Sequence, residues 1–113
     1  MYRCQLEEKG QAPKGITCTL LKNTYGSAST NPDAYFQRSL LNFTNGFKAD
    51  MLFIQGLKDS PIQLYTWPIF KGEVSNCANC KSVQFLELAN FGHTALFEST
   101  QAKTEFNRFI QER

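Results

Sequence analysis

The sequence predicts an α+β protein: a single-layer antiparallel sheet of about six strands, with two amphipathic helices packed on one face and two disulfides. Three observations lead to this prediction. Several short segments alternate apolar and polar residues as strands do, two segments have apolar residues at helical spacing, and the cysteine count is even. The expected order is two strands, a helix, four strands and a helix. We see no regular strand–helix alternation with glycine-rich connections, which argues against a doubly wound parallel sheet.

The bulk composition is that of one small folded domain. The 113 residues are 42% hydrophobic and 13% aromatic, so we expect a single domain over residues 1–113. The net charge is only +2 and no Lys/Arg cluster concentrates it, which argues against a nucleic-acid partner. The longest apolar run, Met51–Ile54, is far too short to span a bilayer. We expect no metal or other cofactor.

Two segments near the N-terminus are predicted to pair as an antiparallel hairpin. In Tyr2–Glu7 and Ile16–Lys22 every second residue is apolar or a cysteine, and turn-forming residues connect the two segments. Pairing centred on Gln11 places Cys4 opposite Cys18. The same pairing brings the apolar side chains onto one face, which is what fixes a register.

The clearest helical pattern follows a polar loop. Asn31 and Pro32 suit the first positions of a helix, and apolar residues then recur at intervals of four, three and four. We predict a helix over Pro32–Thr44 with a left-handed cap at Asn45-Gly46. Its apolar stripe consists of Phe36, Leu40, Phe43 and Phe47.

Four strands are predicted after this helix. Asp50–Leu57 and Ile62–Val74 are expected to form a hairpin through the turn at Lys58–Pro61. Ser82–Phe91 is the next predicted strand, and a tight turn leads into a short final one, Thr94–Glu98.

A second amphipathic helix is predicted at the end of the chain. Ser99 or Thr100 is its expected N-cap. The apolar positions that follow have helical spacing: Ala102, Phe106, Phe109 and Ile110. Since each helix has one apolar side, we expect both to cover the same face of the sheet.

The cysteines predict an oxidising compartment. The hairpin register selects the disulfide Cys4–Cys18 and leaves Cys77 to bond Cys80, and such complete pairing favours a periplasmic or secreted protein. Free buried thiols and a metal site are the alternatives. Met1 leads directly into the first predicted strand without the apolar segment of a signal peptide. This favours a removed leader over a cytosolic protein, and a lipid anchor before Met1 is compatible with it.

Cys77-Ala-Asn-Cys80 is a short motif with three interpretations. We favour a small disulfide loop that pins a turn between Val74 and Val83. The second interpretation is a dithiol redox site, in which a helix N-terminus lowers the pKa of the first thiol. The third is a zinc site completed by Cys4 and Cys18, although the spacing of that pair does not suit a zinc knuckle.

Two ionisable residues are further candidates for chemistry. His93 is the only histidine and follows Gly92 in a predicted turn, where an exposed turn residue is the simpler interpretation and the base of a hydrolase is the alternative. Glu87 is predicted on the same strand face as Val83 and Phe85. A buried carboxylate there would have a shifted pKa, whereas a solvent-facing position explains the charge more simply.

The segment Ile62–Phe70 carries the predicted binding surface. As a strand it has large apolar side chains on both faces, and helices on one side of the sheet cannot cover both. Pro68 cannot donate to a strand ladder and is typical of an edge strand. One face is then left as an aromatic surface for another protein, or is covered by the first hairpin as a second core layer. Its residues are Tyr65, Trp67 and Ile69.

Together these patterns favour a small disulfide-stabilised extracytoplasmic domain that binds another protein. An inhibitor, an immunity-type antagonist and an accessory protein of a secretion or assembly system are all compatible with the pattern. The main alternative is a thiol-disulfide oxidoreductase that uses Cys77 and Cys80. The sequence leaves the oligomeric state undefined.

Overall fold

The computed structural model describes residues 2–113, apart from the side chain of Ile62. The chain divides into two compact units, Met1–Thr44 and Asn45–Arg113. The expected single domain stays a prediction.

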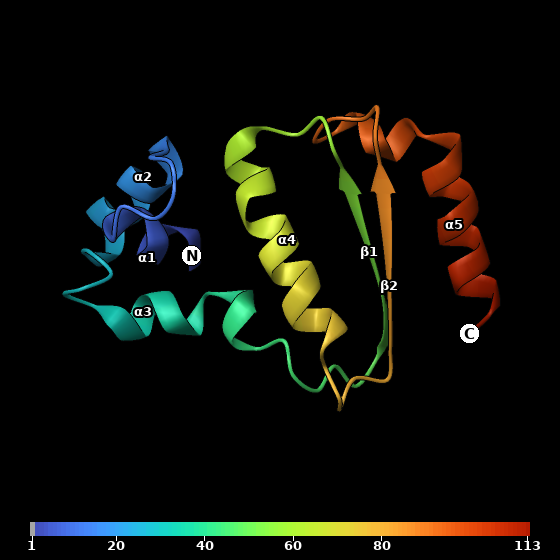
Figure 1. Ribbon diagram of the computed structural model, residues 1–113, viewed down its shortest axis with the longest axis horizontal. Coiled ribbons are helices and arrows are strands. Elements are labelled where there is room, and N and C mark those ends of the chain that lie inside the picture. The colour runs from blue at the N-terminus through green and yellow to red at the C-terminus, as the bar shows by residue number, and fades with distance from the viewer. Residues whose placement is uncertain (1) are drawn as a thin grey trace. The chain divides into compact units, whose positions relative to one another are not determined.

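The first unit is built from short helices (Figure 1). They are α1 (Tyr2–Glu8), α2 (Ile16–Tyr25) and α3 (Pro32–Gln37), followed by the 3-10 turn η1 (Leu40–Asn42). Each α-helix contributes one residue to a small buried cluster, which consists of Cys4, Cys18 and Tyr35.

The predicted N-terminal hairpin is wrong, because both of its segments are helices. A short run with few apolar positions has no decisive period, so alternation over it cannot separate a strand from a helix. The disulfide Cys4–Cys18 is nevertheless present, with 5.4 Å between the Cα atoms. Two packed helices bring cysteines together as closely as paired strands do.

The predicted helix Pro32–Thr44 begins at the expected residue but ends early. α3 stops at Gln37, and η1 follows as a separate turn. The hydroxyl of buried Ser39 donates a hydrogen bond to the carbonyl oxygen of Tyr35, 2.5 Å away, and such bonds compete with the helical ladder. Phe43 is therefore not part of a continuous buried stripe and is 47% exposed.

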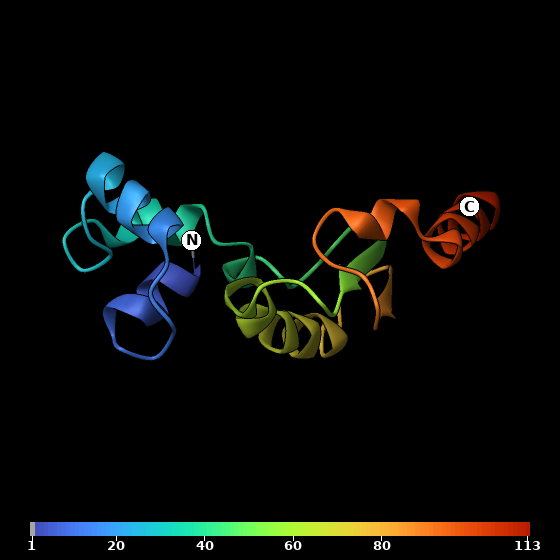
Figure 2. The same cartoon turned by 90° about the horizontal axis from the view of Figure 1, so that it is seen from above.

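The second unit contains a strand–helix–strand unit with parallel strands. Its elements are β1 (Asp50–Gly56), α4 (Pro61–Ser75) and β2 (Ser82–Leu88), and then the 3-10 turn η2 (Ala95–Glu98) and α5 (Thr100–Gln111). β1 and β2 pair along their whole length, first residue with first and last with last. Both views place the two strands between α4 and α5 (Figures 1 and 2).

This arrangement contradicts the predicted antiparallel sheet of six strands. The segment Ile62–Val74 belongs to a helix, and Thr94–Glu98 contains a 3-10 turn in place of a strand. Ser60 marks the start of α4, because its side chain accepts the backbone N–H of Gln63, and Pro61 occupies the first turn. Once α4 is taken for a strand, the strand–helix–strand order disappears, and with it the reason to expect parallel pairing.

Other parts of the prediction are confirmed. The protein is α+β with two disulfides, and the strands expected within Asp50–Leu57 and Ser82–Phe91 are present with slightly shorter bounds. The C-terminal helix is α5, and Ser99 is its N-cap, since its side chain accepts the N–H of Ala102.

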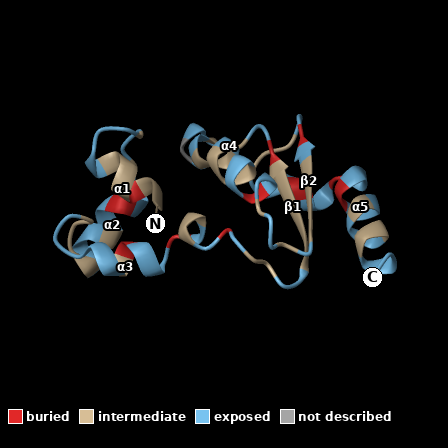
Figure 3. Cartoon of the chain, turned by 60° about the horizontal axis from the view of Figure 1, so that its bottom comes forward, coloured by how far each residue is buried: buried red, intermediate tan, exposed pale blue. Residues whose placement is uncertain are grey.

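One face of the sheet is covered by α4 and the other by α5 (Figures 1 and 2), whereas the sequence predicted the helix Pro32–Thr44 and the C-terminal helix together on one face. Under α4, the rings of Phe53 and Phe85 lie 5.7 Å apart, and Phe70 lies 4.9 Å from Phe53 edge to face. On the opposite face, under η2 and α5, the buried residues are Leu88, Leu96 and Ala102. Figure 3 shows the buried residues of both units in red.

No helix within residues 2–113 combines the length and the apolar character that crossing a bilayer requires.

Candidate functional site

Helix α4 separates the three residues predicted to form one binding surface. Trp67 lies against the sheet: its ring is 5.8 Å from that of Phe85, and its indole N–H donates to the carboxylate of Glu87. Tyr65 and Ile69 are one helical turn apart and lie on another side of α4. Trp67 is therefore not part of an exposed aromatic face.

The side of α4 that faces away from the sheet has no charged side chain over residues 61–72. Four residues at helical spacing, Pro61, Tyr65, Pro68 and Gly72, are all exposed there, and Ile69 lies beside them partly exposed. We call these five residues the outer side of α4. A surface helix normally carries charged and polar side chains on its solvent side, so this composition is unusual.

Glu87 ties β2 to α4. Its carboxylate accepts hydrogen bonds from the ammonium group of Lys71 and from the indole N–H of Trp67. The bond from Lys71, and then that from Trp67, lowers the pKa of Glu87 against the opposing effect of burial. Glu87 is exposed, but it lies at the edge of α4 and not on an open face of the sheet, and its pKa is lowered and not raised by burial.

The disulfide Cys77–Cys80 closes the connection between α4 and β2. The backbone N–H groups of Gly46 and Phe47 point at the two sulfurs, at 3.2 Å from Cys77 Sγ and 3.4 Å from Cys80 Sγ. These contacts hold the segment before β1 against the segment before β2, at the amino ends of both strands.

The position of this disulfide bears on its chemistry. Cys77 follows the C-terminal end of α4, where the helix dipole is negative. A dithiol redox site uses the opposite, positive end of a helix to lower the pKa of its first thiol. The position therefore favours the structural interpretation, and the redox alternative stays an untested prediction.

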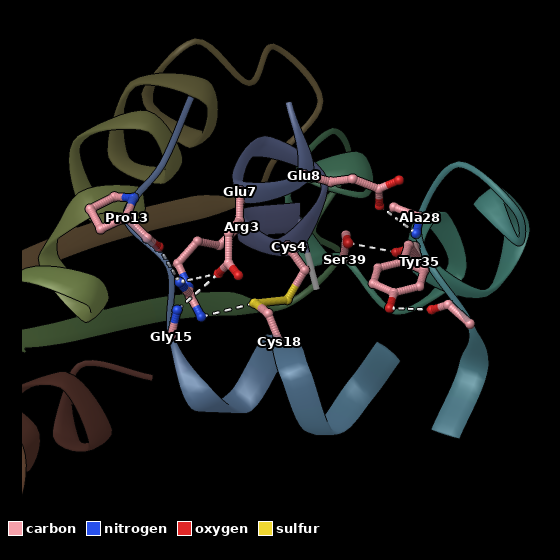
Figure 4. Close-up of a disulfide and its surroundings, with 11 residues drawn as sticks. Arg3, Cys4, Glu7, Glu8, Pro13, Gly15, Cys18, Ala28, Tyr35 and Ser39 are labelled. Atoms are coloured by element: carbon pink, nitrogen blue, oxygen red, sulfur yellow. Dashed lines mark hydrogen bonds and ion pairs between the residues drawn. A yellow bond between two sulfur atoms is a disulfide. The ribbon is translucent and has the colours of Figure 1, made fainter. Parts of the chain in front are cut away.

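Polar groups surround the disulfide of the first unit (Figure 4). The guanidinium of Arg3 donates to the carboxylate of Glu7 at 3.1 Å and to the carbonyl oxygen of Pro13 at 2.9 Å, and it lies 2.9 Å from Cys18 Sγ. Glu7 also accepts the backbone N–H of Gly15 at 3.1 Å. These contacts join α1 to the start of α2 and have a structural role.

Glu8 anchors the loop after α2. Its carboxylate accepts the backbone N–H groups of Ala28 and Ser29, at 2.7 and 3.1 Å, and also the hydroxyl of Ser29. The Ser29 hydroxyl is the main reason why the pKa of Glu8 is below its ordinary value. The hydroxyl of Tyr35 donates to the carbonyl oxygen of Gly26 at 2.7 Å and closes the same loop from the other side.

A carboxylate–imidazole pair lies beyond the carboxyl ends of β1 and β2. Nδ1 of His93 is 2.8 Å from Oδ2 of Asp59, whose side chain is only 5% exposed. Asp59 also accepts the backbone N–H of Ser60 at 2.7 Å and the side-chain amide of Gln55 at 3.2 Å. Burial raises the pKa of Asp59, but the hydrogen bonds from His93, Ser60 and Gln55 outweigh it and leave the pKa below its ordinary value. Asp59 is therefore ionised at neutral pH.

The backbone at Gly56 brings this pair together. A Cβ at Gly56 would collide with the carbonyl oxygens of Phe91 and Gly92, so the loop that carries His93 can pack against the end of β1 only when residue 56 is glycine. The backbone N–H of Lys58 donates to the carbonyl oxygen of Phe91 at 2.9 Å and fixes the two loops to each other.

A pocket of about 430 Å³ lies beside the pair. Asp59, His93, Gln55 and further polar residues form part of its wall. Ligand sites commonly lie at the carboxyl ends of parallel strands, and this volume is within the usual range for small ligands. The remaining wall is apolar and consists of Leu52, Ile54, Leu96 and Phe97.

Sequence reasoning found only half of this site. It identified His93 and placed it in an exposed turn, which agrees with the 68% exposure of its side chain. It missed Asp59, which was interpreted as a turn residue of a hairpin. The parallel pairing of β1 and β2 brings the loops after both strands to the same edge of the sheet. No local sequence pattern predicts the direction of that pairing.

The fold and these sites define a small α+β protein with one strand–helix–strand unit and two disulfides. No family model, curated protein or solved structure matches the chain.

Proposed function

We propose that this protein is a disulfide-stabilised domain that works in the periplasm or outside the cell and binds another protein through the outer side of α4. The observation that carries the proposal is the uncharged composition of that side, where Tyr65 is 36% exposed and Ile69 lies next to it. A protein surface that covered these residues would gain from removing apolar area from water.

The shape of the outer side suits a closely packed partner. Apart from neighbouring residues of α4, no described part of the chain lies within 4 Å of the position where a Cβ of Gly72 would be, so a partner can approach the backbone of α4 there. Tyr65 supplies a large side chain of the type that dominates binding energies at protein interfaces. The partner that fits is a protein with a complementary apolar surface, on which this domain would act as an inhibitor, an immunity-type antagonist or an accessory protein of a secretion or assembly system.

The two disulfides support the proposed compartment. All four cysteines are bonded in pairs, and structural disulfides are rare in the reducing cytosol. Alkylation of the protein in intact cells, without reductant, should find no free thiols. Four reactive thiols in that experiment would contradict the compartment.

Binding is tested by affinity capture from the source organism with matched variants. Wild type and Phe106→Ser should retain the same protein, whereas Tyr65→Ser combined with Ile69→Ser should lose it. Phe106 is the matched control because it is a large apolar residue, 54% exposed, on a different helix.

The captured protein is then purified for a direct measurement. Its affinity should fall about tenfold or more with Tyr65→Ser, since an anchoring aromatic residue contributes on the order of 2 kcal/mol at an interface. Equal affinity for wild type and Tyr65→Ser, or equal loss in the Phe106→Ser control, would contradict the proposed surface.

A further inference from the structure

The contact with Asp59 determines which nitrogen of His93 is left for a ligand. An ionised carboxylate can only accept hydrogen bonds, so Nδ1 of His93 must carry the hydrogen that it shares with Oδ2 at 2.8 Å. In the neutral imidazole, Nε2 then has a lone pair and no hydrogen.

The carboxylate also fixes the orientation of the imidazole ring. Asp59 is itself held by the N–H of Ser60 and the amide of Gln55, and its side chain is almost fully buried. His93 is therefore a positioned hydrogen-bond acceptor in the wall of the pocket.

The apolar part of the wall has room for a flat molecule. Leu52 and Ile54 come from β1, and Leu96 and Phe97 come from η2. Phe97 is 72% exposed, so much of its ring surface has no contact within the unit. Aromatic rings pack favourably on one another and on aliphatic side chains, and a cavity of about 430 Å³ accommodates a molecule of one or two rings.

We propose that this pocket binds small aromatic alcohols of the phenol and naphthol class. The ring lies among the four apolar side chains, and the hydroxyl donates a hydrogen bond to Nε2 of His93. This site does not include the outer side of α4, and the proposal does not depend on the proposed protein partner.

The test compares two probes that differ by one hydrogen-bond donor. 2-Naphthol has a hydroxyl hydrogen, whereas 2-methoxynaphthalene has the same ring system and none. Wild type should bind 2-naphthol about tenfold more tightly, as measured by probe fluorescence and calorimetry, because one well-placed hydrogen bond contributes about that factor. In His93→Ala the two probes should bind alike, with 2-naphthol weakened about tenfold. Phe106→Ser, outside the pocket, should leave both affinities unchanged.

Asp59→Asn gives a second, more specific readout. The asparagine amide can donate to Nδ1, which favours the tautomer with its hydrogen on Nε2. The preference for 2-naphthol should then disappear without any loss of affinity for 2-methoxynaphthalene, whereas simple loosening of the pocket would weaken both probes. Nitrogen NMR of wild type, in which His93 is the only histidine, should show Nδ1 protonated and an Nε2 shift that moves on addition of 2-naphthol.

Three outcomes would overturn the proposal. They are equal affinity of wild type for the two probes, an unchanged preference in His93→Ala, and an Nε2-protonated tautomer in the neutral wild-type protein. The NMR measurement does not need a variant, so it decides the tautomer even if Asp59→Asn fails to fold. Circular dichroism confirms that the other variants are folded.

Discussion

Trp67 and Tyr65 lie two positions apart on α4 and have opposite surroundings. The indole ring of Trp67 packs on Phe70 and Phe85, and its N–H has a partner in Glu87. Tyr65 lies on the outer side, with about a third of its surface exposed. The contribution of each residue to stability should differ accordingly.

We predict that Trp67→Ala lowers the free energy of unfolding by about 3 kcal/mol, since it removes a large ring from the aromatic cluster under α4. Tyr65→Ala should lower it by less than about 1 kcal/mol, as exposed substitutions usually do. Urea unfolding followed by circular dichroism measures both values. Similar losses in the two variants would show that Trp67 is not packed against the sheet.

At the level of residues, sequence reasoning succeeded where chemistry alone was informative. Both predicted cysteine pairs are present, although the hairpin register that selected Cys4–Cys18 is wrong, and His93 is exposed in a turn as expected. It could not assign Trp67 to the sheet side of α4. In a strand, residues 65 and 67 point to the same face, whereas in a helix they lie on different sides.

Among the elements, α4 is the one on which the fold prediction depended. Its apolar residues occur on all sides, so neither a period of two nor one of 3.6 stands out, and Pro68 within it argued further against a helix. The sequence signals for a helix are confined to the first residues of α4. Ser60 caps the helix and Pro61 fits its first turn, whereas the same residues were interpreted as a hairpin turn.

β1, β2 and α5 were predictable because their sequence patterns are clear, unlike that of α4. α5 is strongly amphipathic and has a clear N-cap at Ser99, and the two strands are short apolar runs bounded by turn-forming residues. The direction of pairing between the strands is a long-range property. It became predictable only with the correct assignment of the element between them.

The loop after α2 makes a prediction about pH. The pKa of Glu8 is lower in the folded protein than its ordinary value of 4.5, chiefly because of Ser29. A carboxyl group with a depressed folded-state pKa stabilises the fold above its unfolded pKa and loses that contribution as the pH falls through its folded pKa. Glu8→Gln should therefore reduce the loss of stability on acidification below about pH 4.5, and leave stability less dependent on pH there.

Urea midpoints measured across this acidic range test the role of Glu8. Glu73→Gln, an exposed substitution on α4, is the control and should follow the wild-type pH dependence. An unchanged acid dependence in Glu8→Gln would show that the carboxylate does not anchor the loop.

In the molecule as a whole, each compact unit contains one disulfide. The bonded cysteines are 14 residues apart in the first unit and 3 apart in the second. A longer closed loop restricts the unfolded chain more. The first disulfide should therefore contribute more to stability than the second.

We predict that replacing Cys4 and Cys18 together by serine lowers the free energy of unfolding by about 3 kcal/mol. The same change at Cys77 and Cys80 should lower it by about 2 kcal/mol. Trp67, the only tryptophan, reports on the second unit by fluorescence, and circular dichroism reports on the whole chain.

The same curves test the single domain expected from the sequence. If residues 1–113 unfold as one domain, each double variant shifts the fluorescence and circular dichroism curves together. If the double variant at Cys4 and Cys18 shifts the circular dichroism curve but leaves the fluorescence curve unchanged, the single domain is contradicted.

The parallel pairing of β1 and β2 has a consequence for synthesis on the ribosome. β1 leaves the exit tunnel first, and the whole of α4 must follow before β2 can supply its hydrogen bonds. During that interval Phe53 can pack only on residues that are already synthesised, namely Phe47 before the strand and Phe70 of α4. The nascent chain therefore depends on α4 to protect an unpaired strand until β2 has also left the tunnel.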